Sequence, residues 1–534
     1  MSKDPVDVLI VGAGASGAAV AWSLLDTRMR IVCLEQGGRP DSASFPATGL
    51  DWEARRAGDH NISPNVRNWP EDYPINDSDS PIKVSNYNGV GGGTVLYAAH
   101  FPRFHPSDFR VRSLDNVADD WPVSYETLEP FFAENDRMMG VSGLTGDTAY
   151  PPGKTPVMPP IPMGKSGKRL AQAFNSLGWH WWPCDLAIAS EPYEGRAGCI
   201  NLGVCLAGCA QGAKGSVDVT YWPHAQRGGV ELRTGCRVRE IKVDENDMAT
   251  GVVYFDADGV EQFQAAHIVI LAANGVGTPR LLLNSVSKQF PDGLANRNGL
   301  VGKNLMFHPY ALVQGVFDEP LDGYKGAHKS ILSQEFYETD PDRGFVRGYT
   351  FETSRGMGPA ATAIAGLDWG VVPWGSGHHD AVRGLVNRVT SLIAICEDLP
   401  EEHNRVTLDP EMTDSNGIPA PKIQYRLSEN SKAMLTHACE RGTEALKAAG
   451  AREVFTTAPI AQAGWHLLGT ARMGHDPETS VVNGWGRTHD VRNLFIVDGS
   501  IFVTSGGVNP TSTLQALSLY IADQMKRRLA DLFD

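Results

Sequence analysis

The feature that most constrains the fold of this chain is a glycine-rich turn near its start. An apolar run ends at Val11 and is followed at once by glycines at Gly12, Gly14 and Gly17. A helical stretch and a second apolar run follow, and that run ends at Glu35. Strand, glycine turn, helix, strand and acidic residue, in this order, form the βαβ unit that binds dinucleotides. We therefore expect this segment to begin a Rossmann-like domain.

Each position of this turn has its own expected role. Gly12 allows the tight turn, Gly14 lets the backbone approach a pyrophosphate, and Gly17 lets the helix pack close to the strand. Glu35 is placed to accept hydrogen bonds from a ribose, and it disfavours NADP because it would repel the 2′-phosphate. These residues alone do not distinguish NAD from FAD. The expected cofactor contacts of the turn are Gly12, Gly14, Ala15, Ser16 and Gly17.

Length and charge narrow the function classes further. A chain of 534 residues suggests two or more lobes. With 47 basic and 62 acidic residues, the net charge of −15 argues against nucleic-acid binding. We see no signal peptide and no run of about 18 apolar residues, so we expect a cytoplasmic protein without an integral membrane segment. A protein exported to the periplasm together with a signal-bearing partner would have the same sequence features.

The remaining chain alternates between loops and nucleotide-domain elements. Residues 36–80 are polar and are expected to run over the surface, and the proline-rich residues 151–164 mark a change of lobe. A second glycine cluster, Gly91–Gly93 before Thr94, suggests backbone packed against a flat ligand. Residues 267–273 form a continuous apolar run, typical of a buried parallel strand. A helix is expected to follow, with Thr278 as its N-cap and Pro279 in its first position.

Four blocks in this order resemble the glucose–methanol–choline (GMC) family of FAD oxidoreductases, nearly from end to end. The blocks are residues 12–35, residues 89–94, residues 275–283 (GVGTPRLLL), and a C-terminal set made of 465–474 (WHLLGTARMG), 498–500 and 508–511. The resemblance implies FAD rather than NAD. It lies closest to the gluconate/glucose dehydrogenase catalytic subunits and pyranose oxidase.

The resemblance implies an α/β fold (α+β overall). A Rossmann-like FAD-binding lobe would carry an inserted substrate lobe, built on an antiparallel sheet covered by helices. The expected boundaries are 1–50, 80–120, 200–310 and 456–534 for the FAD-binding lobe, and 51–79, 121–199 and 311–455 for the substrate lobe.

The family pattern places the catalytic pair at His466 and Asn509. A neutral imidazole can accept the hydroxyl proton of an alcohol while the carbinol carbon gives hydride to flavin N5. Asn509 does not titrate, so it would hold the substrate oxygen and support the developing alkoxide. Further cofactor contacts implied by the resemblance are Gly91, Gly92, Gly93, Thr94, Val238, Asp498, Gly499, Asn509, Pro510 and Thr511. Thr94-Val95-Leu96 occupies the place where some members carry a covalently linked histidine, so we expect non-covalent FAD.

Three cysteines lie within eleven residues, at Cys199, Cys205 and Cys209. Their spacing resembles the motif that holds a [3Fe–4S] cluster in bacterial FAD glucose dehydrogenase complexes, although Ala210 replaces a common proline. Three thiolates suffice for such a cluster. Packing of three small side chains in a loop, or a zinc site with a fourth ligand, are the alternatives.

These features favour an FAD-dependent dehydrogenase that oxidises a primary or secondary alcohol, such as a sugar, glycoside or polyol, and passes electrons to an external acceptor. An oxygen-using oxidase, a hydroxynitrile-lyase-like flavoprotein without net redox chemistry, and an electron-passing subunit are the other interpretations. A cluster would argue for a small partner subunit.

Overall fold

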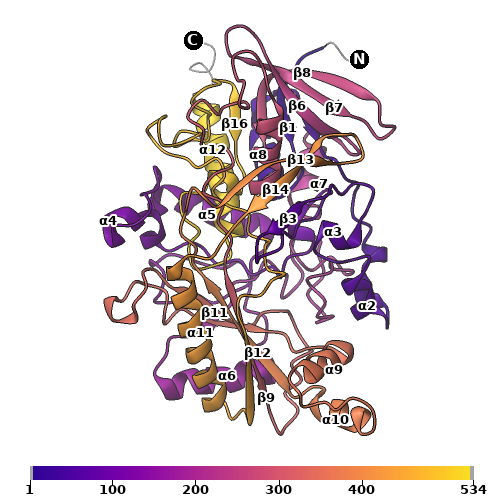
Figure 1. Ribbon diagram of the computed structural model, residues 1–534, viewed down its shortest axis with the longest axis vertical. Coiled ribbons are helices and arrows are strands. Elements are labelled where there is room, and N and C mark those ends of the chain that lie inside the picture. Colours follow the sequence, from indigo (N-terminus) through magenta and orange to yellow (C-terminus); the bar gives the residue numbers. More distant parts are fainter. Residues whose placement is uncertain (1–3, 529–534) are drawn as a thin grey trace.

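The computed structural model describes residues 4–528, and its two main sheets lie one above the other along the longest axis (Figure 1). The first sheet has a parallel core in the order β5-β2-β1-β8, and β16 also pairs with β8 in parallel. Antiparallel β7 and β6 extend it from the other half of β8. Its strands are β1 (Val6–Val11), β2 (Ile31–Leu34), β5 (Glu231–Arg233), β6 (Arg237–Val243), β7 (Ala249–Phe255), β8 (Glu261–Leu271) and β16 (Leu494–Ile496).

The parallel strands β1, β2 and β16 consist, apart from Asp7, of apolar residues that are buried on both faces, as expected for strands covered by helices, whereas the edge strand β5 is partly exposed. Helices α1 and α12 pack together, and α7 and α5 extend this layer by packing on α1 and α12 respectively. Helix α5 begins after an N-cap at Ser124, whose hydroxyl accepts a hydrogen bond from the Thr127 amide. The helices of this part of the chain are α1 (Ala15–Ser23), α5 (Tyr125–Met139), α7 (Tyr221–Arg227), α8 (Asn274–Asn284) and α12 (Thr511–Arg527).

The second sheet is antiparallel, and its order is β15-β9-β12-β11-β10-β4. Helices α6 (Gly164–Leu177) and α11 (Glu429–Ala448) cover one face of it. Alternate residues of a strand point to opposite faces, so Ala311 and Val313 join the core under α11 while Tyr310 and Leu312 face a cavity. The strands are β4 (Trp182–Pro183), β9 (Tyr310–Val316), β10 (Ile331–Ser333), β11 (Tyr349–Ser354), β12 (Val389–Cys396) and β15 (Glu453–Thr457).

A small third sheet, β13-β14-β3, lies between the two large ones (Figure 1). Its strand β3 comes from the segment 36–80, which was expected to run over the surface. That expectation is wrong in part, because Ile62 and Tyr73 of the segment line the cavity and Arg67 is buried against Asp72. The elements are β3 (Asn76–Asp79), β13 (Arg405–Thr413) and β14 (Pro419–Gln424).

The predicted start of helix α8 is also wrong. The helix begins at Asn274, whose side-chain oxygen accepts from the amides of Val276 and Gly277 and so caps it four residues early. The Thr278 hydroxyl is thereby free to donate to Asp498, at 2.5 Å. The other helices are α2 (Trp52–Ala57), α3 (Pro64–Arg67), α4 (Val111–Asp115), α9 (Pro359–Asp368) and α10 (His378–Leu385). Within residues 4–528, no helix is long and apolar enough to cross a membrane.

Candidate active site

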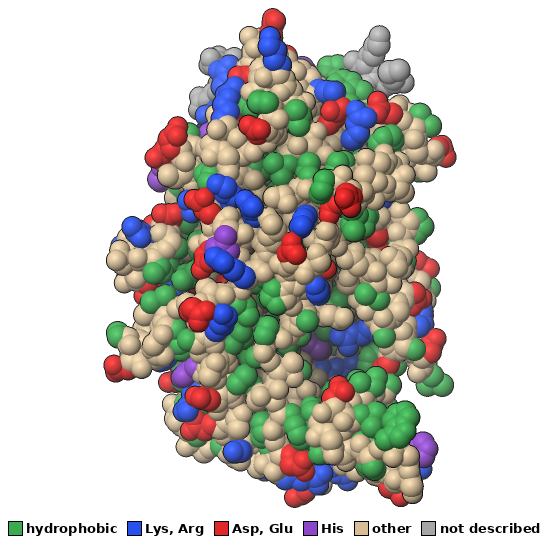
Figure 2. All heavy atoms as spheres, viewed as in Figure 1, with side chains coloured by type: hydrophobic (Ala, Val, Ile, Leu, Met, Phe, Trp, Pro, Cys, Tyr) green, Lys and Arg blue, Asp and Glu red, His purple; other side chains and the backbone are tan. Residues whose placement is uncertain are grey.

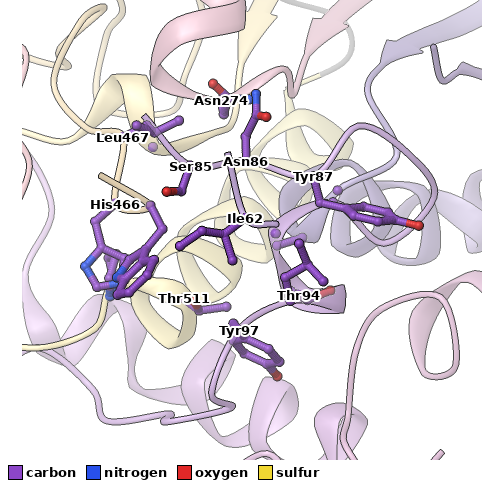
Figure 3. A pocket seen from close by; sticks show the side chains of 18 of the residues that line it. Ile62, Ser85, Asn86, Tyr87, Thr94, Tyr97, Asn274, His466, Leu467 and Thr511 are labelled. Carbon is purple, nitrogen blue, oxygen red and sulfur yellow. The ribbon is translucent and has the colours of Figure 1, made fainter. Parts of the chain in front are cut away.

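A cavity of about 630 Å³ runs between the first and second sheets and takes in most of the predicted site residues. Its walls come from the glycine turn, the second glycine cluster, strand β9, and the C-terminal blocks around residues 466 and 509. Figure 3 shows the side chains of Ile62, Thr94, His466 and Thr511 arranged around the same space. We call the part near Glu35 the nucleotide end and the part near His466 the reaction end.

At the nucleotide end the glycines shape the backbone as predicted. Gly12 has φ +105°, and a Cβ there would lie 2.5 Å from the Ala272 carbonyl oxygen. A Cβ on Gly17 would strike the Gly12 carbonyl, so both residues are fixed by packing. Gly14 faces the cavity with room above it. Gly17 itself is not part of the cavity wall, so it shapes the turn but does not face the space in which a cofactor would bind.

Glu35 lines the cavity and also braces the turn. One carboxylate oxygen accepts from the Ala13 amide at 2.8 Å and the other from the Gly37 amide at 3.0 Å. Burial raises the pKa of the Glu35 carboxyl, while these amides oppose the shift. The carboxylate therefore links the turn to the end of β2, at the position expected for a ribose.

The second glycine cluster packs directly on the first. Gly92 has φ +52°, and a Cβ there would lie 2.8 Å from the Gly14 Cα. Gly93 is open to the cavity, whereas Gly91 only shapes the loop. The Thr94 hydroxyl donates to the Gly91 carbonyl at 2.6 Å, so it holds the loop closed. Two glycine-rich backbones in contact leave a groove without side chains, which suits a flat, phosphate-bearing group.

The C-terminal block completes this groove. Asp498 accepts from the Thr278 hydroxyl and from the Ser500 amide and hydroxyl, at 2.5, 2.9 and 2.6 Å. Gly499 lines the cavity, and Pro510 and Thr511 bring the N-terminus of α12 to it. A helix N-terminus favours negative charge. Val238 lies on the wall too. Together these residues fit FAD, since they form one groove from Val238 to the start of α12.

His466, at the reaction end, is held in one tautomer. Its Nδ1 lies 2.9 Å from Nδ1 of His308, and Nε2 of His308 lies 2.7 Å from the Gly506 carbonyl oxygen. A carbonyl only accepts, so His308 carries its proton on Nε2 and its Nδ1 must accept. His466 therefore donates from Nδ1, which leaves its Nε2 as an unprotonated acceptor. That nitrogen makes no hydrogen bond within residues 4–528.

The surroundings keep this pair of histidines neutral. Burial, helped by His308 and His100, holds the pKa of His466 well below its usual value. Burial lowers the pKa of His308 to about 4. The Tyr310 hydroxyl lies 3.3 Å from Nδ1 of His466 and accepts a hydrogen bond from the Trp465 indole at 3.1 Å. At neutral pH, His466 is thus available to take a proton.

Asn509 faces a charged cluster that sequence reasoning missed. Its side-chain oxygen lies 2.6 Å from Nδ1 of His100, which also contacts Glu352 at 2.5 Å. Lys329 lies 2.6 Å from the other oxygen of Glu352. Burial opposes the charge on His100, but Glu352 outweighs it and raises the pKa of His100 to about 10. Burial likewise opposes the Glu352 charge, but His100 and Lys329 lower the pKa of Glu352 to about 2.

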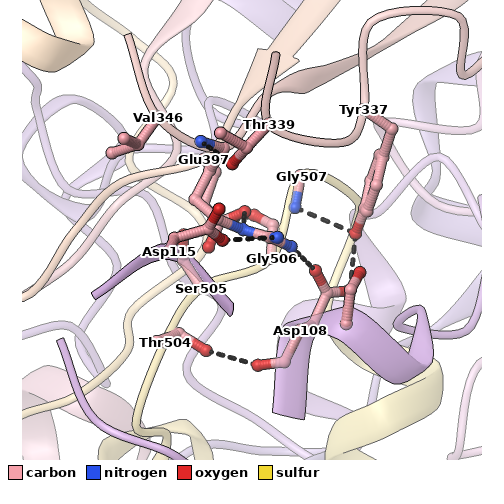
Figure 4. A network of polar contacts seen from close by, with 12 residues as sticks. Asp108, Asp115, Tyr337, Thr339, Val346, Glu397, Thr504, Ser505, Gly506 and Gly507 are labelled. Carbon is pink, nitrogen blue, oxygen red and sulfur yellow. Dashed lines mark hydrogen bonds and ion pairs between the residues drawn. The ribbon is translucent and has the colours of Figure 1, made fainter. Parts of the chain in front are cut away.

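A buried network supports the loop that leads to Asn509 (Figure 4). The Gly507 amide donates to the Tyr337 hydroxyl at 3.1 Å, and that hydroxyl donates to Asp108 at 2.6 Å. The Thr504 hydroxyl donates to the Asp108 carbonyl oxygen, and Arg347 pairs with the Asp108 carboxylate. This network fixes the Gly506 carbonyl, and with it the tautomers of His308 and His466. Arg347 also pairs with Asp115, Glu338 and Glu397.

The structure brings the two predicted catalytic residues into one cavity and adds five that were not predicted: His100, His308, Tyr310, Lys329 and Glu352. One hint was present in the sequence, since His100 follows the second glycine cluster closely. The others lie on or beside strands of the second sheet, without a local motif. Neither His475 nor His489 is part of the cavity wall. Nε2 of His489 lies 2.9 Å from the Ser480 hydroxyl instead.

Of the three alternatives for the cysteine cluster, the structure does not support a metal site. Within residues 4–528, no group of three or more His, Cys, Asp or Glu side chains is arranged to hold a metal ion. Cys199, Cys205 and Cys209 are free thiols, and burial raises the pKa of Cys199 and Cys205. Cys199 and Cys205 pack against the core under the loop, as in the packing alternative. The [3Fe–4S] cluster, which the sequence left as one alternative, is therefore unsupported.

Comparison with known proteins gives a consistent picture. Residues 6–310 and 400–518 match the two sequence models described as GMC oxidoreductase. The chain is 43% identical to 2-methyl-1,2-propanediol dehydrogenase of Mycolicibacterium austroafricanum, covering 100% of this chain and 97% of that protein. It is 30% identical to the fructose dehydrogenase large subunit of Gluconobacter japonicus, with 97% of each covered.

Among solved structures, pyridoxine 4-oxidase from Mesorbium loti shares the fold. It is 18% identical, with a TM-score of 0.67, and covers 98% of this chain and 99% of its own. Formate oxidase of Aspergillus oryzae, a protein described with modified FAD, has a TM-score of 0.67 at 14% identity, with 100% of each chain covered. The chain therefore belongs to the GMC oxidoreductase family, FAD-binding oxidoreductases that act on CH–OH groups.

Proposed function

We propose that this protein is an FAD-dependent dehydrogenase that oxidises a small polyhydric alcohol and passes the electrons to an acceptor other than oxygen. One observation carries the proposal: a neutral His466 presents an unprotonated Nε2 at the reaction end of the cavity that Asn509 also lines. FAD, when bound, supplies the hydride acceptor at N5. The protein has to bind the alcohol, remove its hydroxyl proton and stabilise the oxygen that results.

His466 is the proposed base. Its Nε2 accepts the hydroxyl proton as the carbinol hydrogen leaves as hydride, and the ring becomes an imidazolium. His308 stabilises that cation, because its Nδ1 already accepts the Nδ1 proton of His466 and this hydrogen bond strengthens as charge develops. The low pKa of His466 ensures that the base is free at neutral pH.

Asn509 is the proposed donor to the substrate oxygen. The protonated His100 can only donate, so it selects the oxygen of the Asn509 amide and turns the NH₂ group the other way. The NH₂ group can then donate to the alkoxide that forms during hydride transfer. His100 is thus a positioning residue, and Glu352 and Lys329 hold its charge in place.

The walls of the reaction end suit a small alcohol with both apolar and hydroxyl groups. Leu312, Ile393 and Trp465 supply apolar surface, and Gln314 and Ser391 supply polar groups. The names of the two relatives, a branched 1,2-diol dehydrogenase and a fructose dehydrogenase, support a polyhydric substrate. Because one of them is named as a large subunit, a partner subunit that receives electrons is part of the proposal. We propose that FAD is held without a covalent bond and that the enzyme acts in the cytoplasm.

Anaerobic mixing tests the proposal. The FAD-loaded enzyme is mixed under argon with 2-methyl-1,2-propanediol, 1,2-propanediol, fructose or 1-propanol, and flavin absorbance is followed. We expect bleaching, fastest with a diol or polyol. No bleaching with any of these alcohols would contradict the proposal. Bleaching would also exclude a lyase without net redox chemistry.

An oxygen-using oxidase is the second candidate, favoured by the two oxidases that share the fold. The reduced enzyme is therefore mixed with either oxygenated buffer or an artificial acceptor. Fast reoxidation by the artificial acceptor and slow reoxidation by oxygen are expected. The reverse order would identify an oxidase.

A further inference from the structure

One wall of the cavity carries positive charge, and two of its side chains, Arg56 and Arg355, have no role in the proposed reaction. Arg56 and Arg355 line it together with His328 and Lys329, and we call these four residues the cationic wall. Figure 2 shows Lys or Arg and His side chains in a hollow of the lower part of the molecule. The whole chain has a net charge of −15, so the sign of the cationic wall is opposite to that of the protein.

Arg56 has no partner of its own. This half-buried residue of α2 makes no hydrogen bond or ion pair within residues 4–528, and burial lowers the pKa of its guanidinium. The nearby acid, Glu53, is engaged elsewhere, because its two oxygens accept from the amides of Ala360 and Ala361 at 3.0 Å each. A guanidinium in this position is costly unless an anion or water meets it.

Two hydrogen bonds fix the Arg355 guanidinium in place, but they leave one of its nitrogens unused. Its Nε donates to the Tyr324 carbonyl at 2.7 Å, Nη1 donates to the Gly203 carbonyl at 2.6 Å, and the group lies over the Trp52 ring at 5.3 Å. Its Nη2 makes no hydrogen bond in the part of the chain that the structure describes. A fixed guanidinium with a free edge is well suited to a carboxylate or phosphate.

The other two members of the cationic wall, Lys329 and His328, contribute little unpaired positive charge. Lys329 is already paired with Glu352 at 2.6 Å. Burial, and after it Lys329, Arg56 and Arg355, holds the pKa of His328 well below its usual value, so His328 stays neutral beside these cations. The two arginines therefore outnumber the one nearby carboxylate, Glu53, which forms an ion pair with neither of them within residues 4–528.

We propose that Arg56 and Arg355 form a binding site for a carboxylate or phosphate group of a small molecule that enters this cavity. The inference rests on the proposed function, because the anionic group belongs to either the alcohol or the electron acceptor, and both have to approach the reaction end. The site attracts such molecules and holds their charged group against the wall, while the rest reaches toward the flavin.

Replacement of one arginine tests the site. Arg56→Gln removes a side chain that holds nothing else in place, and Arg55→Gln on the same helix is the matched control. Arg55 does not line the cavity. Its guanidinium donates to the Ser44 carbonyl at 2.8 Å and lies 2.7 Å from Nε2 of His60 and 3.7 Å from Asp59. Each FAD-loaded variant is reduced by alcohol under argon and reoxidised at low ionic strength by ferricyanide, an anion, or by ferrocenium, a cation.

We expect Arg56→Gln to change the ratio of the two reoxidation rates about tenfold in favour of ferrocenium. Arg55→Gln should leave the ratio close to that of the wild type, because Arg55 does not line the cavity and already has an acidic neighbour in Asp59. FAD content should be unchanged in both variants. Loss of FAD from Arg56→Gln would place this side chain on the cofactor and overturn the proposal.

Inorganic phosphate distinguishes the two sources of the anion. Competition with the alcohol in the reductive half-reaction would assign the site to a charged group of the substrate. Competition with ferricyanide alone would assign it to the acceptor. The anion site is wrong if phosphate affects neither half-reaction and Arg56→Gln behaves like Arg55→Gln. Failure of the alcohol to bleach the wild-type flavin would instead contradict the proposed function.

Discussion

The two ends of the cavity are built in different ways. The nucleotide end is made largely of backbone, with Gly12, Gly17 and Gly92 in conformations or contacts that leave no room for a side chain. The reaction end is made of side chains from segments far apart in the chain, such as His308 and His466, 158 residues apart. The comparison teaches that one end is specified locally and the other only by the tertiary fold. The two ends should therefore respond differently to substitution.

The largest effect is expected at the reaction end, from His466→Ala. Loss of the base should lower kcat for alcohol oxidation by about 10²- to 10⁴-fold. The FAD content should stay at the wild-type level, because His466 is not part of the glycine groove. Steady-state kinetics and the flavin-to-protein absorbance ratio check both points. Loss of FAD together with activity would break the distinction between the ends.

The matching change at the nucleotide end is Gly92→Ala. A methyl group at φ +52°, 2.8 Å from the Gly14 Cα, has to push the two glycine loops apart. We expect a cost of about 1–3 kcal/mol, which corresponds to FAD binding that is roughly fivefold to 150-fold weaker. Fluorescence titration of the apoprotein with FAD measures this. In FAD-saturated enzyme, the rate of flavin reduction should change little, and a large loss there would show that the ends are coupled.

His308 should affect chemistry through the tautomer of His466. His308→Leu removes the acceptor for the Nδ1 proton, and we expect kcat to fall about tenfold or somewhat more. His308→Asn is the control, because its side-chain oxygen can take the place of Nδ1. Recovery of most of the rate in His308→Asn supports the tautomer role. Equal losses in both variants, at equal melting temperature, would contradict it.

The role of His100 can be isolated with a double-mutant cycle. His100→Ala should lower kcat about tenfold, since the Asn509 amide is then free to turn. In an Asn509→Ala background the same substitution should have almost no further effect. Fully additive losses would mean that His100 does not act through Asn509. FAD content and thermal unfolding of all four proteins exclude a general loss of structure.

The smallest expected effect is on the pH dependence of stability. The folded pKa of His308, about 4, lies below its unfolded value of about 6.5. The unfolded state therefore binds more protons below pH 6.5, so the stability that neutral His308 allows is complete above pH 6.5 and is lost as the pH falls toward 4. The free energy of unfolding of His308→Leu should depend less on pH across this window. Urea unfolding at pH 7.5, 6 and 5 checks the slope, and identical slopes would contradict the assignment.

The same contrast explains how much could be predicted from the sequence. Glycines and an acid at fixed spacing specify a backbone shape, so the turn at Gly12 and the place of Glu35 on the cavity wall could be predicted from the amino-acid sequence. The family blocks likewise predicted His466 and Asn509 as site residues, and both lie on the same cavity wall. The prediction that α8 starts at Thr278 is wrong because the Asn274 side chain caps the helix earlier, a competition between two capping residues that sequence does not settle.

The cluster around His100 could not be predicted for a different reason. Its charge depends on Glu352 and Lys329, which reach it from the second sheet, 252 residues along the chain in the case of Glu352. Burial and pairing set these pKa values, and neither is visible in local sequence. Likewise, the spacing of the three cysteines suggested a metal site. Among the described residues, 4–528, their side chains are not arranged as one.

The central claim is that His466 removes the substrate proton at a reaction end separate from the cofactor groove. It is tested most directly by stopped-flow reduction of the flavin under argon, comparing wild type with His466→Ala at equal FAD content. We predict that 2-methyl-1,2-propanediol or another polyol bleaches the wild-type flavin and that the variant is reduced at least about a hundredfold more slowly. Equal rates of reduction in the two proteins would contradict the account.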